Sequence, residues 1–302
     1  MHSGWLVFVV VFLILLVVGS HTHTPVEPGR APPSSRRPMI WPATQVPVRY
    51  APAEAPTIPR EWMRAPRLKL RGSPPSEWSQ GTAFAIDGAG KFITARHVTD
   101  GCRQLALVSQ DALQSHSPRL LGFAKEVVQH VSVDVSAVRT RVSAQPLTAS
   151  DDTAPAHGAV AYGFGFPSAQ PGAIKGEFLG RARGRAESRE GEFPLYEWVL
   201  TGREPQSDRP LNGISGGPLV DAHGRVIGIV IGYGSARRAT FDSTTVAAIR
   251  DVAETLQAVS APAQRLAEPV PADNFADYGA KLRLRGSVVP IICRRAPPVP
   301  AQ

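Results

Sequence analysis

The stretch NGISGGPLVDAHGRVIGIVIG, residues 212–232, carries the clearest fold signal in this chain of 302 residues. Its second half predicts a β-hairpin, because two apolar runs, at 218–220 and 226–231, flank the turn-forming segment DAHGR. Its first half surrounds Ser215 with glycines. A loop of this kind holds a serine for no special reason, but a nucleophilic serine requires such a frame. The rest of the chain distinguishes the two interpretations.

Short segments rich in β-forming residues lie on both sides of the hairpin and are separated mostly by Gly, Pro, Asp or Asn. This pattern predicts an all-β barrel or sandwich. One helix is expected within 242–259, where apolar side chains recur at spacings of three and four. The apolar helix positions are Val246, Ile249, Val252, Leu256 and Val259, and the strand-like segments include GTAFAID (81–87), KFITARHV (91–98), RQLALVSQ (103–110), GAVAYGFGF (158–166) and LYEWVLT (195–201).

The distribution of proline suggests the domain limits. Of 29 prolines, 13 lie in residues 21–75 and 7 in residues 261–302, against 9 in the longer segment 76–260. Pro-rich segments with few apolar side chains bury too little surface to offset chain entropy. We therefore expect a folded domain over 76–260, a Pro-rich linker over 21–75 and a Pro-rich C-terminal tail over 261–302. The related hexamers LKLRGS (68–73) and LRLRGS (282–287) are either edge strands of this domain or a chance similarity.

The N-terminus predicts export. Residues 5–18 form an unbroken apolar run that fits the core of a signal peptide and is short for a membrane-spanning helix, which needs about 20 residues. Small residues suit cleavage after Ser20, but no basic residue precedes the run. Residues 1–20 are therefore a signal peptide or an uncleaved signal anchor, with membrane attachment through residues 5–19 in the second case. Both alternatives place the remainder in the periplasm or outside the cell.

Composition excludes several other functions. The net charge is +8, but no basic run has the interleaved aromatic residues of a nucleic-acid site, so we expect no nucleic-acid partner. The sequence has neither a CxxC motif nor a His/Cys cluster, and we expect no metal and no cofactor. Cys102 and Cys293 form one disulfide, which export would permit, or remain two free thiols.

Three polar residues suggest acyl transfer, which needs a nucleophile, a base and a carboxylate that orients the base. Ser215 is the candidate nucleophile. His97 ends a predicted strand in FITARHV, where an imidazole projects into a cleft. Asp134 lies between valines in VSVDV, and a carboxylate buried there requires a partner such as a histidine N–H.

The glycines around Ser215 have candidate roles in the same chemistry. Gly213 allows a backbone bend that aims its own N–H and that of Ser215 at one point, which is the geometry of an oxyanion hole. Gly216 and Gly217 lack side chains, so we expect them to leave room for a substrate chain.

The order His97, Asp134, Ser215 is that of the chymotrypsin-type triad. The motifs TARHV, DVSAV and GISGGPLVD resemble the His, Asp and Ser motifs of trypsin-like serine proteases, and are most similar to the bacterial exported branch that includes the Deg/Htr type. The resemblance covers about residues 78–260. It implies two six-stranded antiparallel β-barrels with the triad between them, and a substrate cleft lined by the strand that contains Gly232. The segment after 260 is too short and too Pro-rich for the PDZ domain that many Deg/Htr proteins carry.

The chain departs from the family pattern at informative positions. Trypsin-like zymogens usually carry an aspartate directly before the serine, and Ile214 stands there, so we expect no activation by N-terminal cleavage. In animal members the residue six positions before the serine lines the primary pocket; Arg209 occupies that position and suggests acidic substrate side chains. A cysteine usually follows the histidine in animal relatives, and Val98 does so here, which leaves the pairing of Cys102 with Cys293 tentative.

The sequence therefore predicts a serine endopeptidase that acts on proteins or peptides. Its catalytic residues are His97, Asp134 and Ser215, with Gly213 and Ser215 as the oxyanion hole. The alternative is a protease-fold binding or scaffold protein of the cell envelope with little or no activity. A scaffold has no need for His97 and Asp134, which favours the enzyme.

Overall fold

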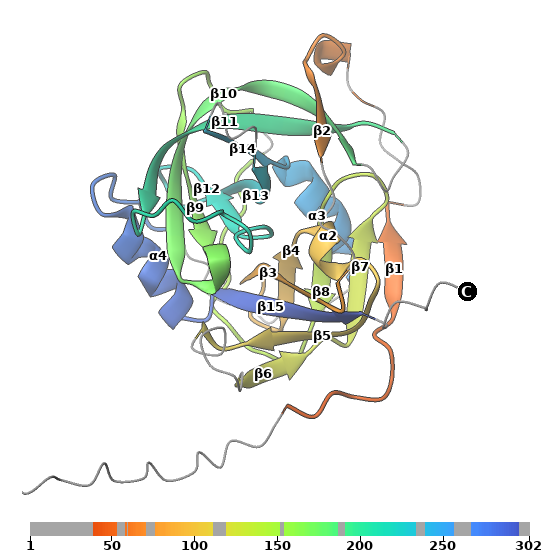
Figure 1. The fold of residues 1–302 in the computed structure, drawn as a ribbon. Coiled ribbons are helices and arrows are strands. Elements are labelled where there is room, and N and C mark those ends of the chain that lie inside the picture. The colour runs from red at the N-terminus through yellow and green to blue at the C-terminus, as the bar shows by residue number, and fades with distance from the viewer. Residues whose placement is uncertain are drawn as a thin grey trace, which may run out of the picture. The chain divides into compact units, whose positions relative to one another are not determined.

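The computed structural model describes most of the chain from residue 39 to residue 295 (Figure 1). No helix in this described part is long and apolar enough to span a membrane. The predicted signal peptide or anchor, most of the predicted linker and the last seven residues lie outside the described residues. The described ranges are 39–52, 58, 60–70, 76–110, 119–151, 154–186, 191–233, 239–256 and 267–295.

The first sheet has eight strands in the order β1-β7-β8-β4-β3-β15-β5-β6. Its edges are β1 and β6, so the sheet curls without closing. The strands are β1 (Val48–Ala51), β3 (Trp78–Ala85), β4 (Lys91–Thr94), β5 (Cys102–Val108), β6 (Leu120–Phe123), β7 (Glu126–His130), β8 (Ser136–Arg139) and β15 (Val288–Arg295).

The second sheet closes into a six-stranded barrel, because β10 pairs with both β9 and β11. A seventh strand, β2 (Arg67–Leu70), adds to the edge of β10 in parallel. The barrel strands are β9 (Val160–Gly165), β10 (Gly172–Ala186), β11 (Phe193–Glu204), β12 (Pro218–Val220), β13 (Val226–Tyr233) and β14 (Thr240–Ser243). The hairpin predicted around DAHGR is present as β12 and β13.

The expectation of two closed six-stranded barrels is thus correct for the second sheet and wrong for the first. The reason is β15, which inserts between β3 and β5 and pairs antiparallel with both. With β15 and β1 added, the first sheet is wider than six strands and ends in two open edges. Figure 1 shows β15, in blue, running alongside β5.

The helices are few and short. They are α2 (Arg96–Thr99), α3 (Val246–Thr255) and α4 (Phe275–Leu284), with 3-10 turns η1 (Arg60–Trp62) and η3 (Pro167–Ala169). The predicted helix is confirmed as α3, but it starts at Val246 because residues 240–243 are strand β14. Both α3 and α4 contact strands of both sheets.

The C-terminal segment corrects the expected domain limits. Helix α4 and strand β15 lie in the region predicted to be a Pro-rich tail, yet Tyr278, Leu282 and Ile291 are buried in the main core. Of the two related hexamers, the first contributes to the edge strand β2, whereas the second spans the end of α4 and the turn after it. The limits 76 and 260 therefore leave out β1, β2, α4 and β15.

The two largest apolar clusters of the described residues stabilise the sheets. One joins them, since it contains Phe84 and Phe92 of the first sheet together with Phe164 and Ile229 of the second. The other fills the closed barrel around the fully buried Trp198, which stacks on Phe241 at 6.2 Å between ring centroids. Burial of such large rings accounts for much of the hydrophobic stabilisation of a domain of this size.

Candidate active site

His97 and Asp134 form a two-point contact. Strand β4 ends at Thr94 and α2 begins at Arg96, which places His97 on the first turn of this short helix. The His97 backbone N–H donates to Asp134 Oδ1 at 2.8 Å, and His97 Nδ1 lies 2.7 Å from Asp134 Oδ2. Because an ionised carboxylate only accepts hydrogen bonds, Nδ1 carries the proton, and in the neutral ring the lone pair is on Nε2. The pair therefore fixes the imidazole in the tautomer that a general base needs.

The Asp134 carboxylate is buried, with 6% of its side chain exposed against 31% for His97. It follows β7 in a tight turn between Val133 and Val135, both fully buried. Burying an unpaired carboxylate there would cost roughly several kcal/mol, and the two N–H groups of His97 offset part of that cost. The sequence argument that this aspartate needs a partner agrees with the contact.

The turn that holds Asp134 is stabilised by a second histidine, which the sequence reading missed. His130 is fully buried at the end of β7, and its Nδ1 accepts the backbone N–H groups of Ser132 at 3.2 Å and Val133 at 3.0 Å. Its Nε2 contacts Asp251 Oδ2 of α3 at 3.2 Å. The sequence signal for this role is the position of His130, which ends a β-rich run four residues before Asp134.

The Ser215 loop is a tight turn between the two sheets. Ile214 N–H donates to Leu211 O at 3.0 Å and Gly217 N–H to Ile214 O at 2.8 Å. Gly213 and Gly216 have positive φ values of 97° and 86°, which L-residues with side chains rarely adopt. Within the described residues, the amides of Gly213 and Ser215 donate to no protein acceptor. These two N–H groups are therefore available to an external oxygen.

Gly81 brings the Ser215 loop against the helix of His97. A Cβ at Gly81 would lie 2.6 Å from Val98 Cγ2 and 3.0 Å from Ser215 O, so both neighbours crowd the same point. The Thr82 N–H donates to Ser215 O at 2.9 Å, which fixes the contact. The structure thus places the backbone of Ser215 beside the residue that follows His97.

The predicted role of Gly216 and Gly217 is corrected by their packing. Both are buried, and a Cβ at Gly216 would lie 2.7 Å from the Ala95 backbone nitrogen and would also collide with Thr82 and Thr94. A Cβ at Gly217 would collide with the Phe164 carbonyl. These glycines let the protein's own strands approach the serine loop, instead of leaving room for a substrate.

The two remaining predicted binding residues, Arg209 and Gly232, lie in different elements. Arg209 is exposed, its backbone N–H donates to Ser207 Oγ at 3.1 Å, and its guanidinium forms no ion pair within the described ranges. Gly232 lies in β13, and its backbone pairs with Asp242 of β14. Val230, two residues earlier on β13, exchanges hydrogen bonds with Gly216 and Gly217, so β13 runs directly from the serine loop to Gly232.

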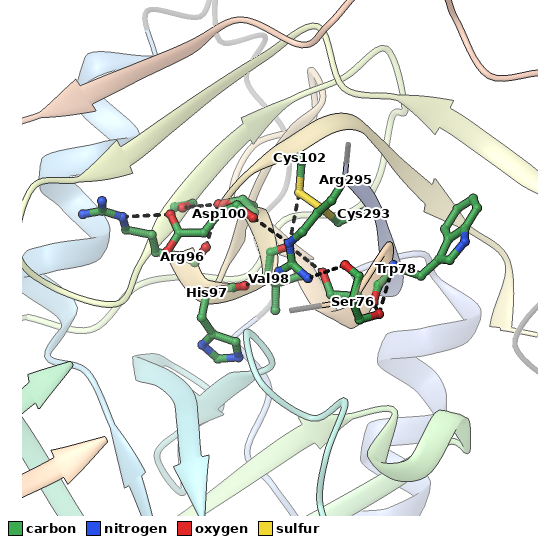
Figure 2. The surroundings of a disulfide bond; sticks show 12 residues. Ser76, Trp78, Arg96, His97, Val98, Asp100, Cys102, Cys293 and Arg295 are labelled. Atoms are coloured by element: carbon green, nitrogen blue, oxygen red, sulfur yellow. Dashed lines mark hydrogen bonds and ion pairs between the residues drawn. A yellow bond between two sulfur atoms is a disulfide. The ribbon is translucent and has the colours of Figure 1, made fainter. Parts of the chain in front are cut away.

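A disulfide joins the neighbourhood of His97 to the C-terminal strand (Figure 2). Cys102 at the start of β5 bonds Cys293 of β15, with the two Cα atoms 5.5 Å apart. Beside it, Arg295 donates from Nη2 to His97 O at 3.2 Å and from Nε to Asp100 O at 2.9 Å. Strand β15 therefore holds both ends of the His97 helix, through one covalent bond and one cationic side chain.

Residues 81–229 match the model of a family described as a trypsin-like peptidase domain. The inactive form of the Rv3671c protease of M. tuberculosis is similar in structure, with 22% identity and a TM-score of 0.45 over 60% of this chain and 88% of that chain. The HtrA-type protease AlgW with a decapeptide is 21% identical, with a TM-score of 0.44 over 58% of this chain and 50% of that chain.

A serine endoprotease from Yersinia pestis is also similar, with 18% identity and a TM-score of 0.41 over 59% of this chain and 57% of that chain. A comparison with curated proteins finds no match. The family match contains His97, Asp134 and Ser215 within its limits. Residues 81–229 of this chain are therefore a trypsin-like peptidase domain.

Proposed function

We propose that this protein is a serine endopeptidase that hydrolyses peptide bonds through His97, Asp134 and Ser215. The observation that carries the proposal is the double contact between His97 and Asp134, which selects the basic tautomer of the imidazole. The Ser215 backbone packs against the same helix through Gly81 and Thr82. A binding module would gain nothing from a buried carboxylate committed to one histidine.

The chemistry follows from these positions. Ser215 Oγ attacks the substrate carbonyl carbon while His97 Nε2 takes its proton, and Asp134 stabilises the imidazolium that forms. The N–H groups of Gly213 and Ser215 receive the oxyanion of the tetrahedral intermediate. His97 then gives its proton to the leaving amine, which leaves an acyl group on Ser215. Water, deprotonated by His97, hydrolyses that ester and restores the enzyme.

The site does not require activation by a new N-terminus. Ile214 occupies the position where a zymogen of this type carries an aspartate, and its side chain is buried in the core of the closed barrel. An apolar side chain there has no charge for an N-terminal ammonium to pair with. We therefore propose that the chain is active without N-terminal cleavage inside the domain.

We also propose that the domain works outside the cytoplasm. The support is the apolar run at residues 5–18 and the disulfide between Cys102 and Cys293, a bond that persists in oxidising compartments. N-terminal sequencing of protein purified from cells tests cleavage after Ser20. A mature chain that retains residue 1 and stays in the membrane fraction would identify an anchor instead.

A fluorophosphonate probe tests the chemistry directly. We expect the purified protein to become labelled on Ser215, and Ser215→Ala to remain unlabelled. His97→Ala should label at least about 100-fold more slowly, because the base is lost. Absence of labelling in protein that is folded by circular dichroism would contradict the proposal and favour a scaffold role.

A further inference from the structure

The Asp242 carboxylate is buried without a partner. Asp242 is 3% exposed at the centre of β14, and its Oδ1 has no hydrogen-bond partner. No donor among the described residues bonds either of its oxygens. Its cross-strand neighbour on β11 is Glu197, which carries the same charge. Burial, followed by the Glu197 charge, raises the pKa of Asp242 to about 7.

Such a carboxylate is costly to the fold, and its position must have another use. A buried charge is normally paired or hydrogen-bonded, and an unpaired one lowers stability. Asp134, only slightly more exposed, is fully satisfied by His97. The missing element at Asp242 is a cation or a hydrogen-bond donor from outside the described chain.

The alternation of β14 turns Asp242 away from the barrel interior, and a β-bulge in β13 sets Gly232 opposite it. The pairing of β13 with β14 shifts between Val230, which pairs with Ser243, and Gly232, which pairs with Asp242. Ser243 faces the interior, because its Oγ accepts the Trp198 Nε1–H at 2.9 Å. Asp242 is the adjacent residue on the strand and projects from the opposite face. The bulge affects β13, where it brings Gly232 opposite Asp242, and bulges are common next to active sites.

Residue 232, which lies beside the carboxylate, is a glycine and places no side chain against it. A Cβ at Gly232 would lie 3.5 Å from Asp242 Oδ2 and 3.8 Å from Leu70 Cδ2, without collision. The carboxylate and an apolar side chain of β2 therefore border the same point. A long basic side chain would find contacts for its methylene stem and for its charged end in this place.

This point lies within substrate reach of Ser215. Gly216 N–H donates to Val230 O at 2.7 Å, and Val230 N–H donates to Gly217 O at 3.0 Å. Gly232 follows two residues later on the same strand. At about 3.3 Å per residue, it lies roughly 7 Å along β13 from the serine loop. A side chain of the residue that precedes the scissile bond spans a distance of this order.

We propose that Asp242 is the specificity-determining residue of this peptidase and binds a lysine or arginine side chain at the substrate position before the scissile bond. The inference rests on the proposed function. It reverses the preference for acidic side chains suggested by Arg209, which is exposed and forms no ion pair in the described part of the chain. The substrate cation supplies the partner that Asp242 lacks, and Glu197 adds to the negative field at the site.

Peptide substrates that differ only in the residue before a fluorogenic leaving group provide the test. We expect arginine and lysine to be preferred over alanine, and glutamate to be worst. Asp242→Asn should lower kcat/KM for the arginine substrate by about 100-fold, since one partner of a buried charge pair is removed. It should change kcat/KM for the alanine substrate by only a few-fold. Glu197→Gln is the matched control and should keep the preference for arginine.

Two further measurements separate this inference from the proposed function. Fluorophosphonate labelling does not depend on the basic side chain, so Asp242→Asn should label like wild type. Binding of p-aminobenzamidine, followed by its fluorescence, tests the cation site without catalysis and should be lost in Asp242→Asn. A labelled protein that binds no benzamidine, or that prefers alanine or glutamate, would overturn the role of Asp242 alone. A protein that is not labelled would overturn the proposed function. In that case, loss of benzamidine binding in Asp242→Asn would still support a cation site at Asp242, and unchanged binding would overturn it.

Discussion

Asp134 and Asp242 are both aspartates on or beside buried strands, and they differ in one respect. Both oxygens of Asp134 contact nitrogen atoms of His97. Neither oxygen of Asp242 has a donor among the described residues, and a second carboxylate lies opposite it. A satisfied buried charge fixes the geometry of the machinery, whereas an unsatisfied one is a binding site that a ligand completes. The predictions below test this difference.

Asp134→Asn has the largest expected effect. The asparagine amide has one oxygen, so it cannot accept hydrogen bonds from both the backbone N–H and the Nδ1–H of His97. The imidazole then no longer favours the tautomer with a basic Nε2. We expect kcat to fall by about 10⁴-fold with little change in KM. Steady-state kinetics on the arginine substrate measures this. A loss of less than tenfold would show that the contact does not orient the base.

Loss of the disulfide is expected to cost the most stability. Cys102 and Cys293 are 191 positions apart, and closing so long a loop stabilises the fold by about 5 kcal/mol through the unfolded state. The double variant Cys102→Ser/Cys293→Ser should melt roughly 10–15 °C lower than wild type. Reductant should lower the melting temperature of wild type and leave that of the double variant unchanged. Equal melting of oxidised wild type and the variant would show that β15 is held by its strand pairing alone.

Replacing each aspartate with asparagine should change the free energy of unfolding in opposite directions. Because the folded-state pKa of Asp242 is raised from 3.8 to about 7, its ionisation destabilises the fold increasingly from pH 4 to pH 7. Asp242→Asn should therefore raise the free energy of unfolding at pH 8 by a few kcal/mol, roughly, and by less at pH 5. Asp134→Asn should lower it by about 1–3 kcal/mol, since a buried donor loses its acceptor.

Urea unfolding of both variants at pH 5 and pH 8 measures these changes, with Glu197→Gln as a control that leaves Asp242 charged. If Asp242→Asn destabilised the protein at pH 8, the carboxylate would have an internal partner. That result would remove the reason to assign it an external one.

The smallest expected effect is a pH dependence of the preference for arginine over alanine substrates. The ratio of kcat/KM for arginine and alanine substrates cancels any pH dependence of the catalytic steps that both substrates share. This ratio should rise about tenfold per pH unit well below pH 7 and level off above it, because kcat/KM reports the free enzyme and only ionised Asp242 attracts the cation. In Asp242→Asn the ratio should be flat. A ratio that does not change with pH in wild type would show that Asp242 does not determine the preference for arginine.

Much of the fold and the family motifs could be predicted from sequence because they depend on local patterns. Short β-rich runs predicted the strands, and apolar residues at spacings of three and four predicted α3. His97 and Asp134 were predictable as a pair, since a carboxylate between valines needs a donor. The contact of Gly216 with Thr94 and Ala95 was not predictable, because it depends on how two distant segments approach each other.

The C-terminal strand shows why proline content misled the domain prediction. Pro290 lies within β15 and pairs with Thr82 of β3 on one side. On the other side, pairing with β5 begins only at Ile291, so the missing N–H of Pro290 breaks no ladder bond there. A proline is tolerated at this position because the neighbouring strand ends beside it. Composition alone contains no information about where that neighbour ends.

Asp242 was accessible to the same argument that identified Asp134. It follows the apolar Phe241 in a strand-like segment, and a buried carboxylate there requires a partner. The segment was instead assigned to the start of the helix, which hid the alternation of the strand. The bulge in β13 that sets Gly232 opposite Asp242 has no signature in the sequence of β14.

The central claim is that Ser215 is a nucleophile activated by His97, and one measurement tests it most directly. Wild-type protein is treated with a fluorophosphonate, digested, and the modified residue is identified by tandem mass spectrometry. We predict a single phosphonylated residue, Ser215, and no modification in His97→Ala on the same timescale. Modification of another serine, or equal modification of Ser215 with and without the imidazole, would contradict the account.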